Sequence, residues 1–168
     1  MPVEVRVRGL IMENQSKSPI VILQETGGER VLPIWIGEAE ARAIGMILAK
    51  EKLERPLTHD LLGMILKGLG ARVVSVTITS LRENTFFAEI HIDHDGKQVV
   101  VDARPSDSLA IALKADARIY VAEEVLSMSG HTAGTTPSPP KTGDKEKAAQ
   151  LKKFLEELDP RDFGKYGL

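Results

Sequence analysis

Three short segments of the chain place acidic and basic side chains at the ends of apolar runs. They are Ile36-Gly37-Glu38-Ala39-Glu40, Arg55-Pro56-Leu57-Thr58-His59-Asp60 and Asp102-Ala103-Arg104-Pro105-Ser106-Asp107. We expect a helix to start in each segment, and the free backbone N–H groups at a helix start attract anions. Two of the segments also carry an arginine, whose planar guanidinium binds phosphate through paired hydrogen bonds. These residue types therefore point to chemistry on a phosphate group.

In a metal-assisted phosphodiesterase these side chains would have different roles in catalysis. His59 is the candidate general base or acid, because its ordinary pKa lies near neutrality. Arg55 and Arg104 are the candidate phosphate clamps. The carboxylates that are candidate Mg²⁺ or Mn²⁺ ligands come from both sides of the arginines. They are Glu38, Glu40, Asp60, Asp102 and Asp107.

Each of these residues also has a plainer interpretation. Glu40 and Asp107 stand near the third position of their helices, where acids satisfy free N–H groups and meet the positive end of the helix dipole. Asp60 in a first turn has the same explanation, and Arg104 would then only pair with a neighbouring aspartate. A second histidine group, His91, Asp93 and His94, lies on one predicted strand. Because His91 and Asp93 share one face of the strand while His94 points to the other, a solvated strand end is favoured there over a metal site.

The elements that must position these residues follow from periodicity. Strands are predicted at Val3–Val7, Ile20–Leu23 and Val31–Ile36, with a Gly27-Gly28 hairpin turn and a helix from Gly37 to about Leu53. A joining helix runs from Thr58 to Leu69. Its apolar stripe, which we expect to be buried, comprises Leu61, Leu62, Ile65, Leu66 and Leu69. The pattern then restarts with strands at 71–80, 85–93 and up to 101, a helix at 105–114, a strand at 119–121 and a helical turn at 122–126.

The second set of elements repeats the first at a shift of 67 residues. Aligned at this shift, Ile34 corresponds to Val101 and Glu40 corresponds to Asp107. We therefore predict an α+β fold with mixed, mainly antiparallel sheets, built from two β-β-β-α halves and a joining helix. The sheets are expected to combine around a pseudo-two-fold axis.

Composition divides the 168 residues into a domain at 1–128, a flexible linker at 129–143 and a tail at 144–168. The linker is rich in Pro, Thr and Gly. The spacing of apolar residues in the tail predicts an amphipathic helix with Leu151, Phe154 and Leu155 on its apolar side. The 22 basic and 24 acidic residues give a net charge of −2, so overall charge does not favour a dedicated nucleic-acid binder.

The chain contains no cysteine, which excludes disulfides and thiol chemistry. Its start, MPVEVRVRGL, lacks the apolar core of a secretory signal, and no run is long enough to span a membrane. We therefore expect a cytoplasmic protein.

The blocks LPIWIGEAEARAI, RPLTHDLL, ARPSDSLAIAL and IYVAEEVL resemble, in order and spacing, those of the bifunctional nuclease domain family. The resemblance covers residues 3–128, and the closing LKKFLEELDPRDFGKYGL is similar to the tail of many bacterial members. It implies an α+β domain that forms a homodimer or larger assembly and cuts DNA and RNA. The matching motif positions are Glu38, Glu40, Arg55, Thr58, His59, Asp60, Arg104, Ser106 and Asp107.

The leading hypothesis is therefore a nuclease for DNA and RNA with little sequence preference. Asp60 joins His59, Arg55 and Arg104 in the catalytic group, while Thr58 and Ser106 add substrate contacts beside the two arginines. The alternative is a non-catalytic oligomeric module that binds a ligand or a protein. The net acidic charge and the low aromatic content favour this alternative.

Overall fold

The first half of the chain forms three antiparallel strands and a helix in the computed structural model, which describes residues 1–13 and 17–132. They are β1 (Pro2–Met12), β2 (Pro19–Glu25), β3 (Arg30–Trp35) and α1 (Glu38–Leu48). Gly27 takes a φ of 78° in the β2–β3 turn, a conformation that glycine adopts without strain. The three strands and the hairpin are confirmed. The helix ends five residues earlier than expected, because Lys50 turns left-handed (φ 54°) and the Glu51 amide bonds back to the Met46 carbonyl.

The second half repeats this order, which confirms the two β-β-β-α units. It comprises β4 (Ala71–Arg82), β5 (Thr85–His94), β6 (Lys97–Ala103) and α3 (Pro105–Ala115). The chain continues through β7 (Arg118–Ala122), α4 (Glu123–Ser129) and β8 (His131–Thr132). Residues 129–132, which the sequence placed in the linker, therefore end α4 and form β8 against β3. The rest of the expected linker and the tail at 144–168 lie outside the described residues.

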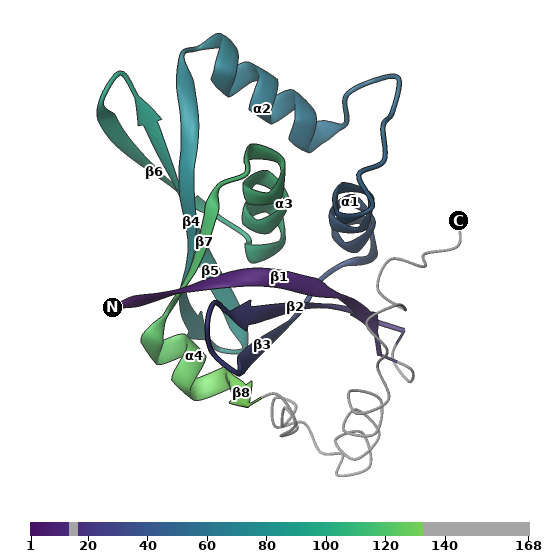
Figure 1. Ribbon diagram of the computed structural model, residues 1–168, viewed down its shortest axis with the longest axis vertical. Coiled ribbons are helices and arrows are strands. Elements are labelled where there is room, and N and C mark those ends of the chain that lie inside the picture. The colour runs from purple at the N-terminus through teal and green to yellow at the C-terminus, as the bar shows by residue number, and fades with distance from the viewer. Residues whose placement is uncertain (14–16, 133–168) are drawn as a thin grey trace.

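A single sheet joins the two halves in the order β6-β5-β4-β7-β1-β2-β3-β8. The connection is β7, which runs antiparallel to β1 and parallel to β4 (Figure 1). The predicted mixed, mainly antiparallel α+β architecture is thus confirmed, with one continuous sheet in place of two.

The main core lies between this sheet and the pair of helices α1 and α3, which lie side by side on one face (Figure 1). Both halves contribute fully buried side chains: Leu23, Leu32, Ile44, Ile78 and Leu109 have no exposed surface. Removing each from water contributes about 1.5–3 kcal/mol to folding. This packing fixes the start of α3, which carries Asp107.

The joining helix α2 (Thr58–Gly68) forms where it was predicted, but the prediction that its apolar stripe is buried is wrong. Leu61, Leu62, Ile65 and Leu69 are 41–65% exposed, and α2 has no fully buried residue. Of the predicted stripe, only Leu66 is partly buried and packs against the core. The inner side of α2 instead carries the polar residues His59 and Asp60. Periodicity predicts that an apolar stripe exists, but it does not identify what covers it.

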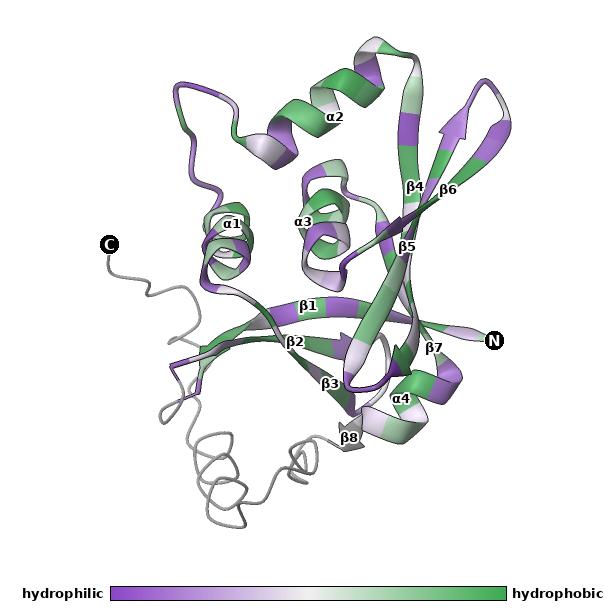
Figure 2. Cartoon of the chain, turned by 180° about the vertical axis from the view of Figure 1, so that it is seen from behind, coloured by the Kyte–Doolittle hydropathy of each residue, from purple (hydrophilic) through white to green (hydrophobic). Residues whose placement is uncertain are grey.

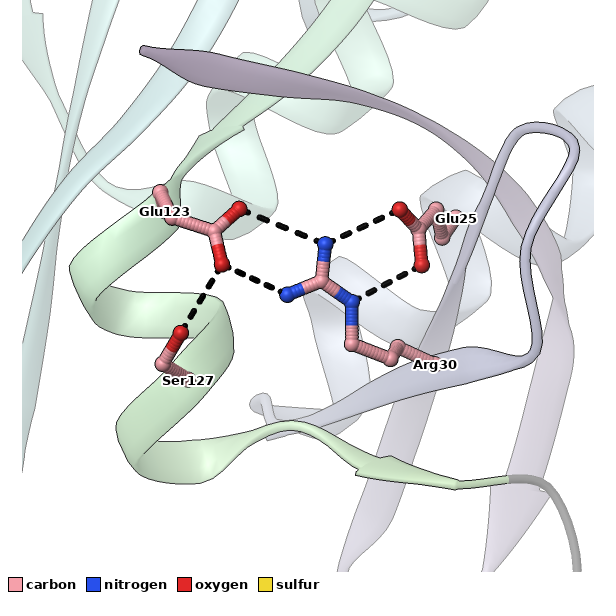
Figure 3. A network of polar contacts seen from close by, with 4 residues as sticks. All are labelled: Glu25, Arg30, Glu123 and Ser127. Atoms are coloured by element: carbon pink, nitrogen blue, oxygen red, sulfur yellow. Dashed lines mark hydrogen bonds and ion pairs between the residues drawn. The ribbon is translucent and has the colours of Figure 1, made fainter.

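Arg30 fastens the β2–β3 hairpin to α4 (Figure 3). Its guanidinium donates to Glu25 on β2 (2.8 and 2.9 Å) and to Glu123 on α4 (2.7 and 3.3 Å). Glu123 also accepts a hydrogen bond from Ser127. The hydrogen bonds from Arg30 lower the pKa of both glutamates below the ordinary value.

This network predicts an acid-sensitive contribution to stability. Its full effect is present above the unfolded-state glutamate pKa near 4.5, and it is lost as pH falls through the lower folded-state values. Urea unfolding of Arg30→Met should therefore show a loss of stability at pH 7 that shrinks below about pH 4.5. Arg42→Met, which changes an exposed arginine of α1, is the control. A loss that is the same at both pH values would contradict this interpretation.

Candidate functional site

His59 and Asp107 bring the second and third polar segments together. His59 lies in the first turn of α2 and Asp107 in the first turn of α3. The His59 Nε2 atom is 3.4 Å from Asp107 Oδ1, and the two side chains are 16% and 32% exposed. Residues 48 positions apart thus form a partly shielded histidine–carboxylate pair.

Arg104 connects this pair to the first polar segment. It precedes α3, and its Nε and Nη2 atoms donate to Asp107 at 2.7 and 3.2 Å. Its Nη1 atom is 2.9 Å from Oε1 of Glu40 on α1. One guanidinium therefore holds the starts of α1 and α3 together, and it fixes the Asp107 carboxylate that faces His59.

The charge on Asp107 determines which nitrogen of His59 carries the hydrogen that faces it. Burial raises the pKa of Asp107, but the hydrogen bonds from Arg104 and His59 outweigh burial and hold that pKa below the ordinary value. Near neutral pH Asp107 is ionised and only accepts hydrogen bonds. The His59 Nε2 atom must therefore carry a hydrogen, which leaves Nδ1 of the neutral imidazole as a proton acceptor.

Asp60 has a different set of partners. Its Oδ1 atom is 2.6 Å from Lys114 Nζ on α3, and Oδ2 accepts the Leu57 backbone N–H at 3.0 Å. The hydrogen bond from Lys114, followed by the one from Leu57, lowers the pKa of Asp60. This is the capping contact that the plainer interpretation expected, and it also ties α2 to α3.

The remaining candidates lie at varying distances from this network. Arg55 belongs to the exposed segment before α2, and Thr58 is exposed in the first turn of α2. Ser106 is 7% exposed and leaves little surface for a substrate. Glu38 and Asp102 form no hydrogen bond or ion pair with the network within residues 1–13 and 17–132. On β6, Asp102 lies opposite Glu89 of the neighbouring strand β5, and both point to the sheet face away from α3.

A cavity of about 780 Å³ lies between α1, α2, α3 and the start of β4. His59, Arg55 and Asp60 line it. So do four cationic residues that sequence reasoning missed: Lys52, Lys67, Arg72 and Lys114. Asp60 pairs with Lys114 and Asp93 pairs with Arg72. Lys114 had a usable signal, because it lies seven residues after Asp107 and therefore on the same face of α3.

Comparison with known proteins identifies the family. The Bifunctional nuclease domain family matches residues 21–133. The chain belongs to this family. "Uncharacterized protein Rv1829" of Mycobacterium tuberculosis is 39% identical over 162 residues, which cover 95% of this chain and 97% of the relative. "Bifunctional nuclease 1" of Oryza sativa subsp. indica is 23% identical over 114 residues, covering 66% of this chain and 34% of the rice protein.

Three of the five carboxylates predicted as metal ligands face cations in this bifunctional nuclease domain. Glu40 and Asp107 contact Arg104, while Asp60 contacts Lys114. In the described part of the chain, no three His, Asp or Glu side chains form a group suited to a metal ion. Asp93, from the second histidine group, pairs with Arg72, as a strand-end residue would. As arranged in this chain, the donor set does not fit Mg²⁺ or Mn²⁺.

The Asp60–Lys114 pair gives a direct prediction for this family member. Lys114→Met should raise the pKa of Asp60 toward its ordinary value of 3.8, because it removes the largest cause of the lowering. Carboxyl-detected NMR titration measures this. Lys67→Met removes another cavity lysine and should leave the Asp60 pKa where it is. An unchanged pKa in Lys114→Met would contradict the ion pair.

No helix among the described residues is long and apolar enough to cross a membrane.

Proposed function

We propose that the protein is a nuclease that hydrolyses phosphodiester bonds of DNA and RNA with little sequence preference. The observation that carries the proposal is the Asp107-held His59, which also lines a cavity with five cationic side chains and the acidic side chains of Glu51, Glu54 and Asp60. Membership of the bifunctional nuclease domain family and the printed name of the rice relative support it. We further propose that it works in the cytoplasm, for which the absence of cysteine is the supporting feature.

In this proposal His59 is the general base. Its Nδ1 atom takes a proton from water, the water oxygen forms the new bond to phosphorus, and the bond to the leaving sugar oxygen breaks. The ionised Asp107 stabilises the imidazolium that forms, and His59 then returns a proton to the leaving oxygen. General acid–base catalysis of this kind contributes about 10²- to 10⁴-fold to a rate.

The cationic side chains supply the binding of the phosphate. Arg55 and Lys67 line the cavity that His59 also lines, and Arg104 keeps an exposed guanidinium surface beside Asp107. Thr58, exposed next to His59, is the proposed neutral contact. Positive charge held in place before the reaction stabilises the charge that develops on the phosphoryl oxygens.

The use of Mg²⁺ or Mn²⁺ stays a prediction, and no step above depends on it. Cleavage of single- and double-stranded DNA and RNA should be measured with each metal and with EDTA. Activity that survives EDTA and depends on His59 would assign the chemistry to the protein's own side chains. Activity that EDTA abolishes would mean that a metal binds after the carboxylates rearrange.

The second candidate is a non-catalytic oligomeric module, which the exposed apolar stripe of α2 favours. Salt dependence separates the two. A nuclease that contacts several phosphates should bind DNA with an affinity that falls steeply as salt rises, because condensed counterions are released on binding. A module that recognises proteins should show no DNA binding of this kind. We propose a homo-oligomer in either case.

A further inference from the structure

The cavity that His59 lines is apolar where it meets the core of the domain. Ile47 of α1, Leu66 of α2 and Ile111 of α3 line it, and all three are partly buried against the main core. Val73 of β4 joins them. In Figures 1 and 2, α2 lies above α1 and α3, and Figure 2 colours the segment 49–57 that leads to α2 as mainly hydrophilic. A ligand in this cavity would therefore contact both apolar and charged side chains.

Gly63 leaves space in this cavity. It lies in the middle of α2, four residues after His59 and three before Leu66, and therefore on the side of the helix that faces the domain. It lines the cavity, and a Cβ atom added to it would meet no atom of the rest of the domain within 4 Å. A glycine inside a helix costs about 0.5–1 kcal/mol relative to alanine. Because an added Cβ would clash with nothing, close packing does not explain this glycine, and its effect is to keep the cavity wide.

Three cationic residues of the cavity are available to an anion. Lys52, Arg55 and Lys67 line it, and within residues 1–13 and 17–132 none of the three forms an ion pair. Lys114, by contrast, is held by Asp60. An anionic group that enters the cavity would therefore be attracted by charges that no carboxylate of the described residues neutralises through direct contact.

The size of the cavity distinguishes a single nucleotide from a duplex. Its volume of about 780 Å³ lies within the range of roughly 300–1,000 Å³ that is typical of small-ligand pockets. A sphere of this volume is about 11 Å across, whereas the major groove of B-form DNA alone is about 12 Å wide. A base-paired duplex therefore cannot enter the cavity. Its bases are also stacked inside the duplex, where the apolar lining cannot reach them.

We propose that the site acts on single-stranded nucleic acid, with one unpaired nucleotide entering the cavity. Its base would lie beside Gly63 and the apolar lining, and its phosphate beside His59 and the cationic side chains. His59 is only 16% exposed, so the reacting phosphate must come to the cavity. The acidic lining residues Glu51 and Glu54 can accept hydrogen bonds from the amino groups of a base. The proposal rests on the proposed function, because it names the substrate class of that same site.

Fluorescence anisotropy of the full-length chain in EDTA tests the proposal without requiring cleavage. The probe is one fluorescein-labelled oligonucleotide, used as a single strand and annealed to its complement. We expect the single strand to bind at least about tenfold more tightly than the duplex, which corresponds to about 1.4 kcal/mol. A surface that only contacts phosphates would give the opposite order, because the duplex carries the higher density of charge. A duplex that binds as tightly as the single strand would overturn the proposal, and so would the absence of binding to either.

Gly63→Leu tests the cavity itself. The added side chain would occupy the space beside the base, so the affinity for the single strand should fall at least about tenfold. Gly68→Leu is the matched control, because Gly68 also lies in α2 with nothing within 4 Å of an added Cβ, yet it does not line the cavity. Both variants replace a helix glycine with a better helix former, and circular dichroism verifies that they are folded.

A folded Gly63→Leu protein that binds the single strand as tightly as Gly68→Leu would contradict the role of the cavity. If Gly63→Leu does not fold, Gly63→Ala adds only one methyl group to the same open space. The comparison of single strand with duplex uses the wild type, so it stays decisive whatever the variants do.

Cleavage of a hairpin oligonucleotide separates this proposal from the proposed function. The hairpin carries paired and unpaired nucleotides in one molecule, so the positions of the cuts compare them directly. We expect the cuts to lie in the loop. Equal cutting of stem and loop would overturn the selectivity for single strands and leave the nuclease activity standing. Preferential binding of the single strand without any cleavage would contradict the nuclease and leave the single-strand site standing.

Discussion

Replacing His59 with alanine is expected to lower kcat for phosphodiester cleavage by about 10²- to 10⁴-fold, the usual contribution of a positioned general base. His59 both lines the cavity and contacts the ionised Asp107. Its loss removes the proton acceptor but leaves the cationic side chains in place. Substrate affinity should therefore change less than kcat, which steady-state kinetics separates.

His94→Ala is the matched control for this experiment. His94 is an exposed histidine at the end of β5, and its Nε2 atom is 3.6 Å from Oδ2 of its neighbour Asp95. Its removal should leave kcat within about twofold of the wild type, since substitutions away from a site have small effects. If the folded His59→Ala protein cleaves as fast as His94→Ala, His59 is not the general base.

Replacing Leu109 with alanine is expected to lower the free energy of unfolding by about 2–5 kcal/mol, because it opens a cavity in the core. Leu109 lies on α3 with no exposed surface. Met128→Ala, at a 76% exposed position on α4, should change stability by about 0.5 kcal/mol or less. Chemical denaturation measures both variants. Equal effects would contradict the burial of α3 as the central core helix.

Much of the fold could be predicted from the sequence because local patterns determine it. Alternating residues such as Val3, Val5 and Val7 form a strand, and the glycine pair at 27–28 forms the hairpin turn. The repeat of the sequence pattern at a shift of 67 residues predicted the two β-β-β-α halves. The way the halves join could not be predicted, because the local pattern of residues 118–122 predicts a strand but not its neighbours. In the structure this strand, β7, lies between β1 and β4.

The helix α2 shows where periodicity stops being informative. Its leucines form the stripe that was predicted, yet the domain packs against the side that carries His59, Asp60 and Leu66. An apolar stripe is equally consistent with burial in the same chain and with burial against another one. Only the arrangement of the neighbouring elements distinguishes these outcomes.

The sequence indicated which polar segments meet, but it did not determine the contacts that their side chains make. The requirement that the second and third polar segments meet is satisfied by His59 and Asp107. Asp102 differs because strand alternation puts it on the sheet face away from α3. Pairing of Arg104 with a neighbouring aspartate was the plainer interpretation of the sequence, and Arg104 does contact Asp107. Its contact with Glu40 and the contact of Lys114 with Asp60 follow only once α1, α2 and α3 are packed.

The most direct test of the central claim compares wild type and Asp107→Asn in the cleavage of DNA and RNA. Asparagine keeps the shape of the side chain, but it loses the charge that fixes a hydrogen on His59 Nε2. The two proteins should be purified in parallel and verified as folded. We expect kcat to fall at least about tenfold in Asp107→Asn while KM stays within about twofold of the wild type. Equal activity in the two proteins would show that the histidine–carboxylate pair does not perform the reaction.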